Sequence, residues 1–159
     1  MKKLIIGLSV LALIALRFTL PVSAETYGNN VFIGGIVSCD SQYPDATYYF
    51  CSYNTDNNET TNWHTDNLSH PHWVKYDLGA GNEKIVAKVH VKIRNDGDGL
   101  QLKGWKFEGS NDNTNWTQIA TGETTAGPTA WYDLTFSNTI SYRYYKLSST
   151  GNTWNTSYP

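Results

Sequence analysis

Hydrophobic and polar residues alternate along several short stretches of this chain, and this period restricts what the chain can fold into. Valine and isoleucine alternate with lysine and histidine over residues 88–93, and tryptophan and phenylalanine alternate with lysine and glutamate over residues 105–108. A period of two sends successive side chains to opposite faces of a β-strand. We therefore expect strands that each have one buried face and one solvent-facing face.

Other short stretches extend this pattern over much of the chain. Aromatic and β-branched residues predict four more strands, at residues 73–78, 116–121, 131–136 and 142–147. Glycine, asparagine and aspartate form turn clusters at residues 79–82, 95–99 and 111–113. Sustained helical periodicity is absent after residue 24. Short strands separated by polar turns predict an all-β fold, a β-sandwich of the jelly-roll type, whereas residues 25–54 give no clear pattern.

The first 24 residues resemble a signal peptide. Two lysines precede an apolar run over residues 4–16, and a Val-Ser-Ala sequence ends at Ala24. The run is shorter than the roughly 20 apolar residues that a transmembrane helix requires. We expect cleavage after Ala24 and a secreted, extracellular protein, with residues 25–159 forming one domain.

The charge of the exported chain limits its partners. The full sequence carries 12 basic and 14 acidic side chains, and residues 1–24 contain three of the basic ones and none of the acidic ones. Nine basic side chains thus remain against 14 acidic ones, a net charge of −5. A nucleic-acid partner requires a basic face, so we expect none. The acidic balance suits a cation or a neutral ligand such as a sugar.

The chain has two cysteines, Cys39 and Cys51. An exported chain can oxidise them to a disulfide, which would close a loop of about 13 residues and contribute roughly 3 kcal/mol in the chain-entropy model. The alternative is a pair of buried thiols. Their spacing gives no metal-ligand pattern.

Four groups of short motifs occur in a characteristic order. They are Asp56-x-Asn58-x-x-Thr61-x-Trp63, Trp73 with Asp77-Leu78-Gly79, Gly109-Ser110-Asn111-Asp112 with Trp116-Thr117, and Tyr142-Arg143-Tyr144. In this order the chain resembles the discoidin family, the coagulation factor V/VIII type C domain with its galactose-binding-like fold. It is most similar to the bacterial family 32 carbohydrate-binding modules, because of Trp63-His64-Thr65 and the loop at Arg94. The resemblance covers residues 34–147 and implies an eight-stranded jelly roll with a structural calcium ion.

The resemblance places that calcium ion in the segment around Trp63. Asp56, Asn58 and Thr61 match the family's side-chain ligand positions, and the carbonyl of Tyr53 is expected to join them. Calcium takes 6–8 oxygen ligands at about 2.3–2.6 Å. The alternative is a set of Asx-type turns, in which these side chains cap their own backbone. Asn58 stands where the family usually has an aspartate, which lowers the negative charge of the site.

The family's last strand supplies a glutamate to the calcium ion, and no such strand precedes Pro159. We therefore expect the sandwich to lack its C-terminal strand in this sequence. A sandwich without that strand exposes an unpaired edge. The natural protein is accordingly expected to continue, with further domains of the same polypeptide.

The resemblance also indicates a sugar-binding site. Such sites pair an aromatic platform with polar side chains that read hydroxyl groups. The candidate contacts are His64, Arg94, Asn95 and Trp154. Trp154 lies in a polar loop, so it is either a stacking platform or a residue that the absent strand would cover, and His64 and Arg94 could equally be solvated side chains. Tyr43 and Tyr48 could line the same rim.

Two classes of function fit these features. The first is a non-catalytic carbohydrate-binding module that recognises glycans of the galactose or amino-sugar type and tethers a larger protein to them. The second is a cell-adhesion domain, or one that recognises protein or membrane lipid. Lipid binders expose apolar loop tips flanked by basic residues, whereas the loops here are rich in Asn, Asp and Thr. This composition favours sugar and argues against membrane lipid.

Catalytic motifs are absent from the sequence. It contains neither a nucleophile elbow nor a phosphate-binding loop. His70 and His72 could suggest a metal pair, but no third ligand stands at a recognisable spacing. We therefore expect no independent enzymatic activity, and at most the role of an accessory module in a secreted glycoside hydrolase.

Overall fold

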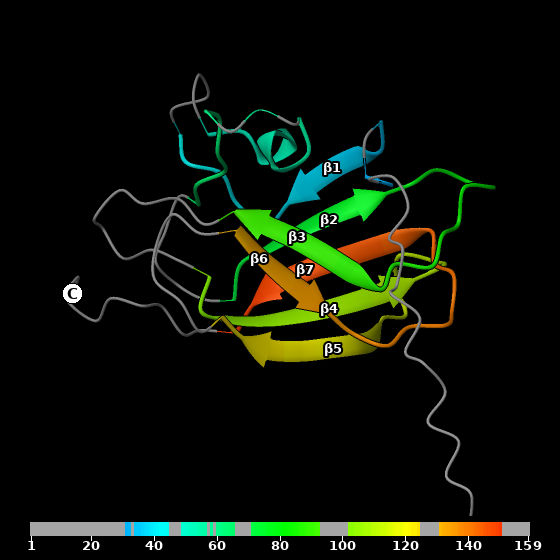
Figure 1. The fold of residues 1–159 in the computed structure, drawn as a ribbon. Coiled ribbons are helices and arrows are strands. Elements are labelled where there is room, and N and C mark those ends of the chain that lie inside the picture. Colours follow the sequence, from blue (N-terminus) through cyan, green and yellow to red (C-terminus); the bar gives the residue numbers. More distant parts are fainter. Residues whose placement is uncertain are drawn as a thin grey trace, which may run out of the picture.

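Two antiparallel sheets make up the protein. The computed structural model describes residues 31–32, 34–44, 49–56, 58, 60–65, 71–92, 102–124 and 131–150. One sheet has five strands in the order β1-β2-β7-β4-β5, and the other pairs β3 with β6. The elements are β1 (Ile36–Cys39), the short 3-10 helix η1 (Cys51–Asn54), β2 (Trp73–Asp77), β3 (Lys88–Lys92), β4 (Gly104–Ser110), β5 (Thr117–Glu123), β6 (Trp131–Thr135) and β7 (Tyr144–Ser149). Figure 1 shows β3 and β6 crossing over the larger sheet. The prediction of an all-β sandwich is confirmed.

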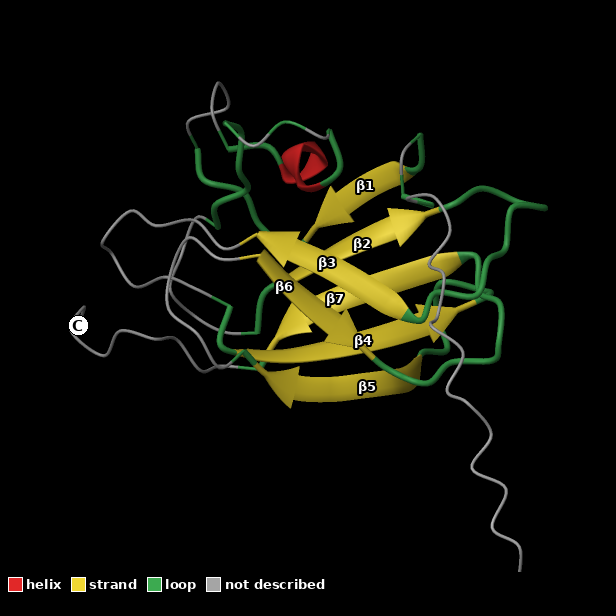
Figure 2. Ribbon diagram, viewed as in Figure 1, coloured by secondary structure: helices red, strands yellow, loops and turns green. Residues whose placement is uncertain are grey.

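Six of these strands, β2 to β7, are the ones that the sequence pattern predicts, with ends that differ by about two residues. β1 was not predicted, because it lies in the segment without a clear pattern. It forms through its partner: Ile36 pairs with Asp77 and Cys39 pairs with Val74, in antiparallel register. Figure 2 shows how little helix accompanies the strands. In the described part of the chain, no helix is long and apolar enough to cross a membrane.

The core lies between the two sheets and is largely aromatic. Phe107 of β4 and Tyr145 of β7 are fully buried at its centre, with ring centroids 5.3 Å apart and an interplanar angle of 9°. Leu134 of β6 is also buried and belongs to the same cluster. Burying a large apolar side chain contributes about 1.5–3 kcal/mol. The buried hydrophobic residues are Val74, Tyr76, Val86, Trp105, Phe107, Leu134, Tyr142, Tyr145 and Leu147.

Three segments meet where β2 ends and β7 begins. The Arg143 guanidinium donates to both carboxylate oxygens of Asp77, from Nε to Oδ1 at 2.7 Å and from Nη2 to Oδ2 at 2.8 Å. The backbone N–H of Arg143 donates to Asn111 Oδ1 at 2.9 Å. Two parallel bonds fix the geometry of an Arg–carboxylate pair. This polar clasp therefore joins three motifs that are far apart in sequence, at one end of the sandwich.

The clasp leads to a prediction about acid stability. Hydrogen bonding by Arg143 is the main reason that the pKa of Asp77 lies below its usual value, and hydrogen bonds from Asn115 and Thr114 likewise lower the pKa of Asp112. A lowered native pKa stabilises the fold above the unfolded-state pKa of about 3.9 and ceases to do so as the pH falls through the native value. Urea unfolding should thus show the free energy of unfolding falling steadily below about pH 4.

The Asp77→Asn variant provides the control for this prediction. It removes the titrating carboxylate and keeps the shape of the side chain, so its stability should be lower at pH 7 and should fall less steeply between pH 4 and pH 2. Parallel pH profiles for the wild type and the variant would contradict a role for Asp77 in the acid response.

Candidate functional site

The connection between β1 and β2, residues 40–72, leaves the sandwich at the end opposite the polar clasp. In Figure 2 its described part, with η1, stands beyond the end of β1. Asp40 closes the base of this connection: its Oδ2 lies 2.7 Å from His72 Nδ1, and its Oδ1 accepts from the backbone N–H of Trp73 at 2.9 Å. Because His72 is buried, both ends of the connection are fixed to the sheet.

Trp63 anchors the middle of this connection. Its ring packs against the core, and its Nε1–H donates to the carbonyl of Ser41 at 2.9 Å. The backbone N–H of Tyr43 donates to the carbonyl of His64 at 2.8 Å. Residues 41–43 and 63–65 are thus held side by side, which positions the side chains that follow Trp63.

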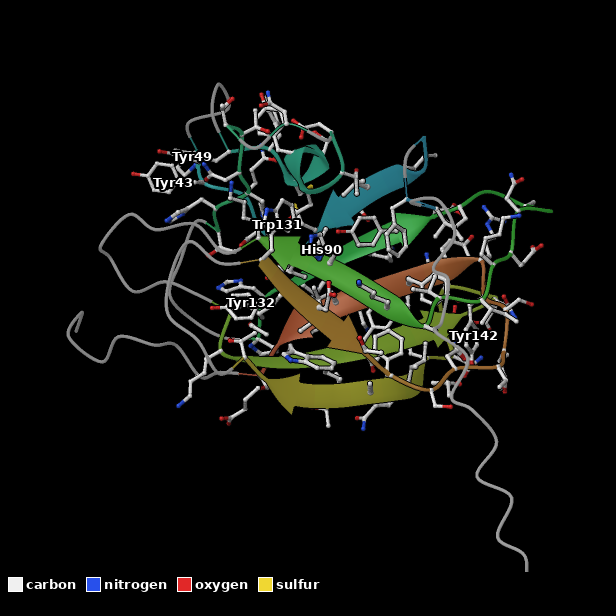
Figure 3. All side chains as sticks on the ribbon, in the orientation of Figure 1. Tyr43, Tyr49, His90, Trp131, Tyr132 and Tyr142 are labelled. Atoms are coloured by element: carbon white, nitrogen blue, oxygen red, sulfur yellow. The ribbon has the colours of Figure 1, made fainter. Side chains whose placement is uncertain are left out.

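Three aromatic rings gather on this framework, and we call Tyr43, Tyr49 and His64 the three-ring cluster. The ring centroids of Tyr43 and Tyr49 lie 5.6 Å apart, those of Tyr43 and His64 5.4 Å apart, and those of Tyr49 and His64 5.5 Å apart. Tyr43 is 43% exposed. Figure 3 shows Tyr43 and Tyr49 at the outer edge of the connection. The cluster therefore presents aromatic surface beside a histidine and tyrosine hydroxyl groups.

The hydrogen bond of His64 determines which of its two ring nitrogens carries the proton. Nδ1 lies 2.7 Å from the carbonyl oxygen of Thr65. A carbonyl can only accept, so Nδ1 must carry the proton, and Nε2 of the neutral ring is then an acceptor. His64 can thus accept a hydrogen bond from a hydroxyl group of a ligand at the cluster.

Oxygen-bearing side chains follow η1, in the segment where calcium is predicted. Asp56 Oδ1 accepts from the backbone N–H of Asn58 at 2.9 Å, and Asp56 Oδ2 accepts from the Thr61 hydroxyl at 2.6 Å. Asn58 Oδ1 accepts from the backbone N–H and the hydroxyl of Thr60, at 3.0 Å and 2.8 Å. The two bonds from backbone N–H groups are the Asx-type bonds that the sequence allows as the alternative to calcium.

The same atoms also suit a hard cation, because carboxylate, amide and hydroxyl oxygens are calcium ligands. Asp56 supplies the negative charge, and Tyr53 lies in η1, three residues before it. Among the described residues, no group of three or more His, Cys, Asp and Glu could hold a metal ion. A site here would thus depend on neutral oxygen atoms, and calcium stays a prediction.

Cys39 and Cys51 approach each other where η1 contacts β1. Cys39 ends β1, Cys51 begins η1, and the two free thiols interact with each other. Burial, followed by the interactions with Cys51, raises the pKa of Cys39 to about 12. Its thiol is therefore protonated and a poor nucleophile at neutral pH. The two residues are close, as a bridge would require, and the disulfide stays a prediction.

Three of the four predicted ligand contacts, Arg94, Asn95 and Trp154, lie outside the described residues, as does Tyr48. They stay predictions. The structure brings the fourth, His64, together with Tyr43, which the sequence suggested as a rim residue. Tyr49 was not anticipated. The aromatic run over residues 48–50 was its only signal, and that run does not indicate which ring would reach His64.

His72 and its neighbours do not form a nucleophilic relay. The hydroxyl of Ser41 lies 3.5 Å from His72 Nδ1, the nitrogen that Asp40 already holds at 2.7 Å. A serine relay requires the hydroxyl on the nitrogen opposite the carboxylate. The arrangement therefore fastens the base of the connection and gives no support for catalysis.

Solved structures of carbohydrate-binding modules are similar to this chain. The module CpGH89CBM32-5 from Clostridium perfringens, in complex with GalNAc-β-1,3-galactose, has a TM-score of 0.64 at 20% identity, covering 72% of this chain and 83% of the module. The family 32 module of Clostridium perfringens NanJ, in complex with galactose, has a TM-score of 0.60 at 21% identity, covering 72% and 81%. Chitosan-binding module 1 from a chitosanase/glucanase of Paenibacillus sp. IK-5 has a TM-score of 0.62 at 23% identity, covering 77% and 87%.

These TM-scores, at such low sequence identities, establish a shared fold and no more. No curated protein sequence matches the chain at a significant level. The model of the F5/8 type C domain matches residues 37–159, which is most of the chain. The resemblance to discoidin domains is thereby confirmed, and the chain belongs to the F5/8 type C domain family.

Proposed function

We propose that this protein is an exported, non-catalytic carbohydrate-binding module, and that it binds sugar at the end of the sandwich that carries the three-ring cluster. The observation that carries the proposal is the meeting of Tyr43, Tyr49 and His64 within 5.6 Å of one another on a fixed connection. Its ligands are neutral glycans of the galactose or amino-sugar type. Arg94, Asn95 and Trp154 are proposed as further contacts.

The chemistry of the cluster suits a pyranose. The C–H face of a sugar packs on an aromatic ring, while hydroxyl groups at the ring edge need hydrogen-bonding partners. Tyr43 offers exposed aromatic surface, and His64 and the tyrosine hydroxyls offer the polar partners. Because Trp63 and Asp40 fix the connection, little conformational freedom would be lost on binding.

The similar modules support the ligand class, since they were solved with GalNAc-β-1,3-galactose and with galactose, or are described as binding chitosan. The net charge of −5 after removal of residues 1–24 is unfavourable for polyanionic partners. A single small site binds weakly, and a tethering role gains strength when several modules act together.

A glycan array with a competition arm tests the proposal. Binding should be saturable and should be displaced by the free sugar that the protein prefers. Binding to anionic lipid vesicles without sugar competition would instead indicate a lipid-recognition domain, and binding to neither would contradict the proposed function.

We also propose that the oxygen-rich segment binds a structural calcium ion through Asp56, Asn58, Thr61 and the carbonyl of Tyr53. A ligand that binds only the folded state at 100 times its dissociation constant adds about 2.7 kcal/mol. The melting temperature should therefore fall when EDTA replaces calcium in the buffer. Differential scanning calorimetry measures the effect.

Asp56→Ala provides the control for the calcium prediction. This variant loses hydrogen bonds whether or not calcium binds, so the informative quantity is the difference between its melting temperatures with calcium and with EDTA. That difference should vanish in the variant. A wild type whose melting temperature is unchanged by EDTA would contradict a tight calcium site and favour the Asx-type turns alone.

A further inference from the structure

The outer face of the two-stranded sheet carries an exposed tryptophan that the proposed site does not use. Trp131 is 46% exposed, whereas the other described tryptophans are buried or half-buried. In the register of β3 and β6, Lys92 pairs with Trp131 and His90 pairs with Asp133. Leu134, the residue after Asp133, is buried in the core instead. The side chains on this outer face are therefore not needed to fill the interior.

His90 and Trp131 form a fixed stack on this face. Their rings are parallel, with centroids 4.3 Å apart and an interplanar angle of 2°. His90 Nδ1 lies 2.5 Å from Asp133 Oδ1, and the Lys88 ammonium lies 2.5 Å from Asp133 Oδ2. The carboxylate thus holds the imidazole, and the imidazole covers one face of the indole. The indole is set in place before any ligand arrives, and 46% of the Trp131 surface is exposed to solvent.

The chemistry around the stack suits a sugar unit. An exposed indole provides the apolar platform, and hydrogen-bonding groups surround it. The Lys92 ammonium lies 5.7 Å from the indole centroid. With two lysines and one aspartate, the face has a formal charge of +1 when His90 is neutral. This charge favours uncharged sugars over the protonated amino sugars of chitosan.

The stack lies at the same end of the sandwich as the proposed site. Lys92 is the last residue of β3 and Trp131 is the first residue of β6. Figure 1 shows this end of the small sheet on the same side as the end of β1 and the start of β2. Figure 3 shows Trp131 and His90 over the start of β6 and the body of β3. A glycan chain that leaves the three-ring cluster could therefore continue along this face.

We propose that Trp131, with His90 and Lys92, forms a second saccharide subsite, which takes an internal, uncharged pyranose unit of a chain whose end is held at the three-ring cluster. This inference rests on the proposed function. It makes the ligand an oligosaccharide or polysaccharide instead of a single terminal sugar. The second contact adds affinity because it is made within the same complex.

Calorimetric titration of the purified protein tests the subsite. The probes are galactose with a β-linked galactotetraose, and N-acetylglucosamine with its β-1,4-linked tetramer. Each monomer and its tetramer form one series. In one of the two series, the tetramer should bind the wild type about tenfold more tightly than the monomer. Trp131→Ala should remove this gain and leave the affinity for the monomer within about twofold. Thr135→Ala, an exposed change on the same strand, should leave both affinities unchanged.

A second measurement separates loss of the subsite from a disturbance of the strand pairing by the substitution. The protein is labelled with 5-fluorotryptophan, and Trp131→Phe identifies the Trp131 signal in the ¹⁹F spectrum. This signal should shift with the tetramer and remain in place with the monomer. A tetramer preference that persists in Trp131→Ala, or a Trp131 signal that the tetramer does not move, would overturn the subsite. Absence of binding in both series would overturn the subsite together with the proposed function. Equal binding of monomer and tetramer would overturn the subsite alone.

Discussion

Replacing Gly109 by alanine should destabilise the protein by about 3 kcal/mol, because the space that a methyl group would need is already filled. Gly109 lies in β4, where it pairs with Tyr145 of β7. A Cβ atom at this position would overlap Cδ2 of Tyr142 and lie 2.6 Å from its Cγ. Overlaps with ring carbon atoms at this distance require the ring or the backbone to move.

Tyr142 has little room to move. Its side chain is buried, and its ring meets that of Tyr145 edge-on at 5.9 Å. Its backbone is hydrogen-bonded to Lys84 in both directions, at 3.0 Å and 3.2 Å. The strain of the added methyl group therefore falls on well-packed core residues. Urea unfolding should show the loss as a lower midpoint with an unchanged slope.

Two comparisons make this prediction specific. Thr117→Ala changes the exposed residue that faces Gly109 on β5, and its effect should be within about 0.5 kcal/mol. Introducing Gly109→Ala into a Tyr142→Ala background should cost much less than introducing it into the wild type, because the ring is gone. Equal costs in the two backgrounds would show that the ring is not what excludes the methyl group.

The double variant Tyr43→Ala/His64→Ala should lose at least thirtyfold in affinity for the preferred sugar while remaining folded. A thirtyfold loss corresponds to about 2 kcal/mol, the range of residues that dominate an interface. Tyr43 supplies the most exposed ring of the three-ring cluster and His64 its imidazole acceptor. The two side chains lie outside the sandwich core, so the melting temperature should change little. Titration calorimetry measures the affinity.

Ile140→Ala is the matched control for this loss. Ile140 is 54% exposed and lies two residues before Tyr142, near the opposite end of the sandwich. Its removal should leave sugar affinity unchanged. If the double variant bound sugar as well as the wild type, the binding site would have to be sought elsewhere on the protein.

The strands could be predicted because their pattern is local. In β6 and the residue after it, apolar side chains at every second position, 132, 134 and 136, indicate the buried face, and the structure buries Leu134. The same pattern assigns Trp131 to the outer face and so predicts that its side chain is exposed. This prediction is easy to overlook in an aromatic-rich strand. β1 could not be predicted, because its four residues become a strand only through pairing with β2.

The candidate site was predicted in part, because it is built by long-range contacts. His64 follows Trp63, and its place could be expected from the resemblance to discoidin domains. That Tyr49 would meet His64 depends on how a connection of more than 30 residues folds back on itself, which strand periodicity does not encode. The polar clasp shows the same limit: Asp77, Asn111 and Arg143 belong to separate motifs, and only the sheet order brings them together.

The proposed function requires a fixed sandwich that presents the three-ring cluster to a neutral sugar. Titration of the ¹⁵N-labelled protein with GalNAc-β-1,3-galactose, followed by two-dimensional NMR, tests it most directly. The amides of Tyr43, Tyr49 and His64 should show saturable shifts, while the amides of β2, β4 and β7 stay in place. Shifts confined to the end that carries Asp77 and Arg143, or no saturable shift with this probe, would contradict it.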